Sequence, residues 1–103
     1  MDRPFALRYL PLFEQDLAAV RDYIAINLQN PTAALRLVED TEMAILKRLD
    51  NPLGFKPYHS SRDRKQPYYR IHIRNFTVFY VVVGDVMEVR RFVYSKRNLP
   101  DIV

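Results

Sequence analysis

The chain has 103 residues, with 16 lysines and arginines against 12 aspartates and glutamates, and therefore carries a net charge of +4. This length predicts one domain with one hydrophobic core. The lack of cysteine excludes disulfides and thiolate metal sites, and no apolar run approaches the ~20 residues that a membrane-spanning helix needs. We therefore expect a soluble cytoplasmic protein without a signal peptide or a membrane partner.

Basic residues are concentrated in the C-terminal half of the chain. Residues 1–57 hold 7 lysines and arginines against 8 acidic residues, whereas residues 58–103 hold 9 against 4. Such asymmetry favours an acidic or polyanionic partner for the basic half, although a solvated basic surface would give the same pattern. The second half is therefore the part of the chain in which we expect a binding site.

The first fifty residues predict a short strand followed by two helices. Apolar side chains alternate along residues 5–10, which is typical of a strand, and Pro11 ends it and suits the start of a helix. Apolar residues then recur at steps of three and four from Phe13 to Leu28, and again from Ala34 to Leu49. Each series forms one apolar stripe of an amphipathic helix.

The boundary between the two helices is marked by Asn30 and Pro31. Asn30 can accept a hydrogen bond from an unpaired amide at a helix start, and Pro31 suits the first helical position, where no amide donor is needed. So few residues separate the helices that an antiparallel hairpin is expected. The string NPLG at residues 51–54 ends the second helix.

Three strands are predicted after a polar surface loop at residues 55–67. Alternation starts at Tyr68, residues 76–83 are almost wholly apolar as in a strand covered on both faces, and residues 86–94 form the last strand. Turns are expected at Arg74-Asn75 and at Gly84-Asp85. The parity of the apolar positions is inconsistent across Arg90 and Arg91, and a β-bulge there would resolve it.

These elements predict an α+β fold in the order β-α-α-β-β-β, within a single domain at residues 1–103. The three consecutive strands should form an antiparallel sheet, with the N-terminal helical hairpin packed on one face. The other face would carry Arg70, His72 and Arg74. The loop at residues 59–65 would lie at one end of that face, and Tyr94 to Arg97 at the other.

Cations and aromatic side chains are interleaved on this second face. A metal site or a cofactor is not expected, because His59 and His72 are the only histidines and two glycines cannot build a phosphate-binding loop. Basic side chains neutralise phosphates, and aromatic rings stack on unpaired bases. RNA cleavage would further need a base for the 2′ proton, an acid for the leaving oxygen and cations for the charged phosphorane. The plainer alternatives are packing roles for Tyr68, Tyr69 and Tyr80 and an ordinary polar strand position for His72.

Three sequence segments, which together span nearly the whole chain, are similar in order and spacing to segments of a known protein family. YLPLFEQDLAAVRDYIAINLQNPTAALRL combines a strand, a helix and an NP helix restart, and LDNPLG stops the second helix. YYRIHIRNFTVFYVVVGDVMEVRRFVYSKRN forms the sheet. Together they resemble the RelE/ParE superfamily of toxins from type II toxin–antitoxin (plasmid stabilisation) modules, which implies the fold predicted above.

The resemblance implies two possible activities. RelE-like members cleave mRNA in the ribosomal A site, ParE-like members poison DNA gyrase, and both are neutralised by an antitoxin whose C-terminal segment wraps the toxin. The first hypothesis is a metal-independent endoribonuclease (an mRNA interferase) whose catalytic candidates are Arg70, His72, Tyr94 and Arg97. Its further nucleic-acid-binding candidates are Arg62, Arg64, Lys65, Arg74 and Lys96. The basic face would also receive the antitoxin's acidic segment, which orders on binding.

Two features favour gyrase inhibition, the second hypothesis, in which the helical hairpin and the C-terminal strand bind the target. Thr77 stands where RelE-like nucleases usually carry an arginine, and the tail at residues 101–103 lacks their C-terminal tyrosine. The string YSKRN at residues 94–98 also resembles the ParE-like string HGRRD. The third hypothesis is a non-toxic RNA- or protein-binding relative.

Overall fold

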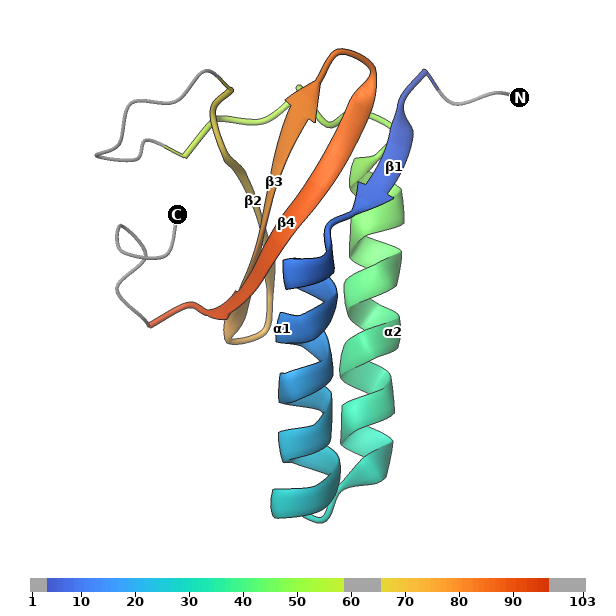
Figure 1. Ribbon diagram of the computed structural model, residues 1–103, viewed down its shortest axis with the longest axis vertical. Coiled ribbons are helices and arrows are strands. Elements are labelled where there is room, and N and C mark those ends of the chain that lie inside the picture. Colours follow the sequence, from blue (N-terminus) through green and yellow to red (C-terminus); the bar gives the residue numbers. More distant parts are fainter. Residues whose placement is uncertain (1–3, 59–65, 97–103) are drawn as a thin grey trace.

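The computed structural model describes residues 4–58 and 66–96 (Figure 1). Its elements are, in chain order, β1 (Ala6–Tyr9), α1 (Pro11–Asp22), the π-helix η1 (Tyr23–Asn27), α2 (Pro31–Arg48), β2 (Tyr69–Ile73), β3 (Phe76–Val83) and β4 (Val86–Tyr94). The predicted α+β fold with its β-α-α-β-β-β order is confirmed. The helical hairpin covers one face of the sheet, as expected.

The sheet has four strands in the order β1-β4-β3-β2. Strands β2, β3 and β4 form the predicted antiparallel meander. Strand β1 adds to β4 in parallel, with Ala6 opposite Val86 and Tyr9 opposite Val89, so the complete sheet is mixed. Because the two helices return the chain to the end of the sheet where β1 began, β2 and β4 run in the same direction as β1 (Figure 1).

The helical hairpin forms where the apolar stripes and the Asn-Pro boundary predicted it. Asn30 caps α2, because its Oδ1 accepts a hydrogen bond from the amide of Ala33 at 3.1 Å, and Pro31 occupies the first turn. The π-helix at the end of α1 was not predicted, and Gln29 follows it with a φ of 51°. The far end of the hairpin extends well past the sheet (Figure 1).

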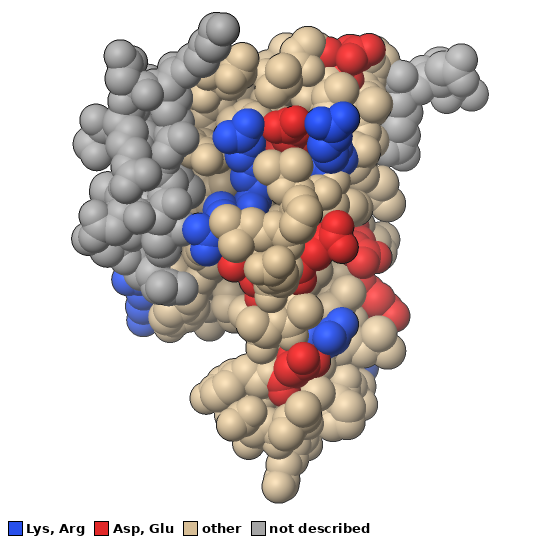
Figure 2. Space-filling model, in the orientation of Figure 1, with Lys and Arg blue, Asp and Glu red and all other residues tan. Residues whose placement is uncertain are grey.

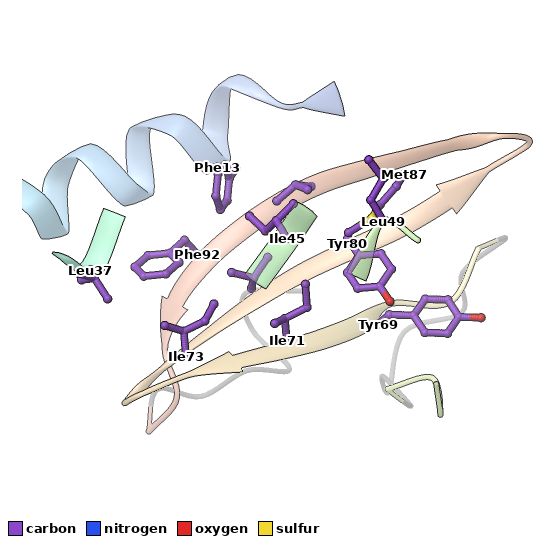
Figure 3. Packing of buried hydrophobic residues seen from close by; sticks show 12 residues of the cluster. Phe13, Leu37, Ile45, Leu49, Tyr69, Ile71, Ile73, Tyr80, Met87 and Phe92 are labelled. Carbon is purple, nitrogen blue, oxygen red and sulfur yellow. The ribbon is translucent and has the colours of Figure 1, made fainter. Parts of the chain in front are cut away.

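Most of the core lies between the helices and the sheet. Figure 3 shows aromatic and aliphatic side chains from α1, α2 and all three meander strands meeting there. Strand β3 is buried on both faces, as predicted, because a second cluster of Tyr68, Phe79, Val81 and Val93 lies on the face away from the helices. Tyr68, Tyr69 and Tyr80 are all buried, so their packing role is confirmed.

The expected β-bulge is present in β4. Phe79 lies opposite Arg91 and Tyr80 lies opposite Val89, so Arg90 is the extra residue between them. A bulge inserts one residue and thereby exchanges the faces of all the side chains that follow it. Val89 before the bulge and Phe92 after it can therefore both pack into the core on the helical side.

Replacing Thr41 by valine is expected to stabilise the protein by about 1 kcal/mol. Thr41 is fully buried in α2, and within the described part of the chain its hydroxyl has no hydrogen-bond partner. An unpaired buried hydroxyl costs roughly 1–3 kcal/mol, which valine avoids at nearly the same shape. Urea unfolding checks this prediction, with Thr32→Val at the exposed start of α2 as the control. A less stable Thr41→Val variant would contradict it.

Candidate functional site

The face of the sheet turned away from the helices, called the open face below, carries a row of polar and charged side chains. Its members are Arg8 on β1, Arg70 and His72 on β2, and Glu88 and Arg90 on β4. On each strand they alternate with side chains that enter the core, which is why the fold gathers them here. Figure 2 shows basic side chains on both sides of an acidic one over the upper part of the sheet.

Glu88 holds two arginines on the open face. Its carboxylate accepts hydrogen bonds from Arg8 Nη1 at 3.3 Å and from Arg90 Nη2 at 3.0 Å. Burial alone would lower the pKa of Arg90, but its hydrogen bonds to Glu88 and to the side chain of Tyr68 outweigh burial and raise that pKa. One carboxylate shared by two guanidinium groups leaves this part of the face positively charged.

Arg70 and His72 are exposed neighbours on β2, as the sequence predicted. The guanidinium carbon of Arg70 lies 4.8 Å from the ring centre of Tyr58, in a cation–π contact. His72 Nδ1 lies 3.3 Å from the hydroxyl of Thr77, which in turn lies 2.7 Å from the hydroxyl of Ser95. Because Thr77 is fully buried, this chain of hydroxyls fixes the orientation of the imidazole ring.

Tyr94 does not join this group, and the expectation that it shares a face with His72 is wrong. Tyr94 lies opposite Phe76 in the sheet, and the two rings meet edge to face at 5.9 Å. Phe76 in turn stacks on the core residue Phe92, with ring centres 4.9 Å apart. The side chain of Tyr94 therefore lies on the helical side, because the bulge at Arg90 has reversed the faces of β4 beyond it.

Arg74 also lies on the helical side, contrary to the expected row of three basic side chains on one face. It follows the last residue of β2, in the predicted turn, and has a φ of 53°. Its Nη2 donates a hydrogen bond to Asp40 of α2 at 2.5 Å. The left-handed backbone conformation ends the alternation of the strand and sends the side chain towards the helices.

The remaining predicted residues are placed only in part. Lys96 is exposed just beyond β4. Arg62, Arg64, Lys65 and Arg97 lie outside the described residues, as does His59. Of the four catalytic candidates, the structure therefore brings Arg70 and His72 together and separates Tyr94 from them.

Two acidic residues that the sequence did not single out organise this region. Glu88 pairs with two arginines on the open face. Asp16 of α1 accepts hydrogen bonds from Arg91 Nε at 2.7 Å and from the backbone amide of Phe92 at 3.0 Å. The only signal for Asp16 in the sequence is its place three residues after the buried Phe13, beside the apolar stripe of α1.

Neither a membrane-spanning helix nor a metal-binding group of side chains is found in the part of the chain that the structure describes. None of its helices is both long and apolar enough to cross a bilayer. No three His, Asp or Glu side chains at residues 4–58 and 66–96 lie where they could share a metal ion. The described site contains guanidinium groups, one imidazole, carboxylates, hydroxyls and aromatic rings.

Comparisons with known proteins identify the family. A family model described as "ParE toxin of type II toxin-antitoxin system, parDE" matches residues 7–99. Among solved structures, the "Chromosomal ParDE TA system from P. aeruginosa" superposes with a TM-score of 0.70, covering 92% of this chain and 100% of that chain at 19% identity. That identity supports likeness of fold alone, and no curated protein matches. Because the family model spans most of the chain, this protein belongs to the ParE toxin family of type II toxin–antitoxin systems.

Proposed function

We propose that this protein is the growth-arresting toxin of its module and that it acts by binding DNA gyrase, without cleaving RNA. The observation that carries the proposal is the separation of His72 and Tyr94 by the thickness of the sheet. Cleavage by 2′-hydroxyl attack needs a base and an acid at the same phosphate. Two candidates on opposite faces cannot both reach one scissile bond.

The other placements support the same choice. Thr77, at the position where RelE-like nucleases usually carry an arginine, is fully buried, and it serves as a hydrogen-bond partner of His72. Arg74 faces α2 and pairs with Asp40. Among the described residues, the open face carries His72 and guanidinium groups held by Glu88 and by the ring of Tyr58. Guanidinium groups suit recognition of an acidic protein surface.

Membership in the ParDE family implies an antitoxin partner. We propose that this antitoxin neutralises the toxin through an acidic segment that covers binding surfaces of the toxin. The net charge of +4 favours such a partner on electrostatic grounds.

The second candidate function is ribosome-dependent mRNA cleavage, and the orientation of His72 favours it. The ring of His72 is held through Nδ1, beside the exposed Arg70. These are the two groups from which a nuclease could draw one proton-transfer residue and one phosphate contact.

Two measurements on cells that express the toxin alone separate these functions. We expect growth arrest with intact mRNA by primer extension and with loss of negative supercoiling in a reporter plasmid. The purified toxin should inhibit supercoiling by gyrase in vitro, and addition of the antitoxin should restore it. New mRNA 5′ ends at one fixed codon position, absent in His72→Ala, would overturn the proposal in favour of cleavage. Normal growth with both readouts unchanged would make the protein a non-toxic relative.

A further inference from the structure

The upper part of the open face holds basic side chains on both sides of an acidic one (Figure 2). Arg8 and Arg90, called the arginine pair below, each donate a hydrogen bond to the carboxylate of Glu88, at 3.3 and 3.0 Å. Arg8 lies opposite Glu88 because β1 and β4 pair in parallel. Arg90 is the inserted residue of the β-bulge. The mixed sheet and its bulge therefore bring together two cations from opposite ends of the chain.

The three side chains differ in how much of each reaches solvent. The side chain of Arg8 is 62% exposed and that of Arg90 is 33% exposed, whereas that of Glu88 is only 13% exposed. A partner that approaches this face meets guanidinium groups and little of the carboxylate between them. Glu88 can therefore act on a partner chiefly through the two arginines that it holds.

Both members of the arginine pair have hydrogen-bond donors that are not used. A guanidinium group carries five N–H donors. Among the residues that the structure describes, Glu88 is the only hydrogen-bond partner of the Arg8 side chain. The Nε of Arg90 is buried, and within the same part of the chain it has no partner. Buried donors without a partner are rare in native proteins, and a functional role of the group is one reason for which they persist.

We propose that the arginine pair binds carboxylates of an acidic surface segment of DNA gyrase, and that Glu88 is the positioning residue that orients both guanidinium groups for this contact. The inference rests on the gyrase target of the proposed function and names the surface of the toxin that contacts it. A guanidinium group binds a carboxylate through two parallel hydrogen bonds, so the orientation of the donors decides the strength of the contact. The nearly buried carboxylate of Glu88 supplies that orientation.

The charge pattern and the aromatic rings favour a protein partner over a nucleic acid. A phosphate backbone presents negative charge alone and is bound best by cations without an acid among them, whereas here Glu88 lies between the two arginines. Unpaired bases also need exposed rings on which to stack. On the described open face Tyr68 is buried, and Arg70 already lies over the ring of Tyr58. An acidic protein segment therefore fits this surface better.

The test measures the affinity of purified toxin variants for purified DNA gyrase by biolayer interferometry. Arg8→Ala removes the more exposed guanidinium group and should weaken binding about tenfold. Glu88→Gln keeps the shape of the side chain and adds one unit to the net charge of +4. Because Gln holds the two arginines less firmly, this variant should also weaken binding, about fivefold, although the toxin is then more positive. If charge alone attracted gyrase, the same substitution would strengthen binding.

The matched controls make the same changes at exposed positions of the helical hairpin. Arg21→Ala removes an arginine that is about as exposed as Arg8 and also pairs with one acid, and Glu39→Gln neutralises an exposed glutamate of α2. Both should leave the affinity for gyrase within about twofold, as expected of exposed charges outside an interface. Circular dichroism should confirm that all four variants are folded.

Three outcomes would overturn the inference while the gyrase target stands. The affinity of gyrase could be unchanged in both Arg8→Ala and Glu88→Gln. Arg21→Ala could weaken binding as much as Arg8→Ala, which would move the contact to the hairpin. Wild-type toxin could bind a short DNA duplex, with tighter binding in Glu88→Gln, which would assign the arginine pair to phosphates. Failure of the proposed function looks different, because wild-type toxin would then neither bind gyrase nor inhibit supercoiling, and this inference would fall with it.

Discussion

Asp16→Ala is expected to lower the free energy of unfolding by about 2 to 3 kcal/mol. Asp16 binds Arg91 through two hydrogen bonds, of 2.7 and 3.2 Å, and accepts a third from the backbone amide of Phe92. The side chains of Asp16 and Arg91 are only 16% and 21% exposed. Alanine would therefore leave a poorly hydrated guanidinium group and an amide at the edge of β4 without their acceptor.

Denaturant unfolding measures this change, with Asp22→Ala as the matched control on the same helix. Asp22 pairs with its neighbour Arg21, and both side chains are more than half exposed. Such exposed pairs contribute little, so the control should change stability by less than about 0.5 kcal/mol. Equal effects of the two substitutions would show that Asp16 does not hold α1 against β4.

The fold was predictable because its signals are local. The stripes of α1 and α2 repeat every three to four residues, and the Asn30-Pro31 boundary has one clear physical meaning. The continuously apolar stretch at residues 76–83 indicated a strand with two covered faces, which β3 is. Strand β1 was predicted, but its parallel pairing with β4 was not. That pairing depends on the path of the whole chain between the two strands, which no local sequence pattern indicates.

The site was less predictable because its geometry depends on one inserted residue. Before the bulge, the even-numbered Glu88 lies on the open face. Unbroken alternation would have placed Tyr94 on that face as well, together with His72. Arg90 shifts the register, and Tyr94 lies on the helical side. The bulge was anticipated from the sequence, but its consequence for Tyr94 requires the position of the extra residue.

Contacts between residues far apart in the sequence were also out of reach of pattern analysis. Asp16 and Arg91 are 75 positions apart, and Arg8 and Glu88 are 80 apart. Each of these four residues is of a charged type that is common at solvent-exposed positions. Only the sheet order, which places β1 and α1 beside β4, brings the partners together.

The second substitution with a large expected effect is Tyr80→Phe, which should lower the free energy of unfolding by about 2 kcal/mol at neutral pH. The hydroxyl of Tyr80 donates a hydrogen bond to the backbone carbonyl of the buried Pro52 at 2.7 Å. It accepts one at 3.0 Å from Arg48 Nη1, which also donates to the carbonyl of Arg70. Phenylalanine would leave the carbonyl of Pro52 without its donor and would loosen the connection between α2 and β2. Tyr69→Phe, which keeps the stacked ring pair at 5.3 Å, is the control.

The same substitution should change the response to alkaline pH. Burial raises the pKa of Tyr80 above its ordinary value of 10.0, although the hydrogen bond and the charge of Arg48 act in the opposite direction. Below pH 10 the Tyr80 hydroxyl keeps its proton in both the folded and the unfolded states. As the pH rises above 10, the unfolded chain loses this proton first, so the free energy of unfolding falls. The difference in stability between wild type and Tyr80→Phe should therefore shrink between pH 9 and pH 11 in urea titrations. A constant difference across that range would show that the Tyr80 hydroxyl titrates alike in both states.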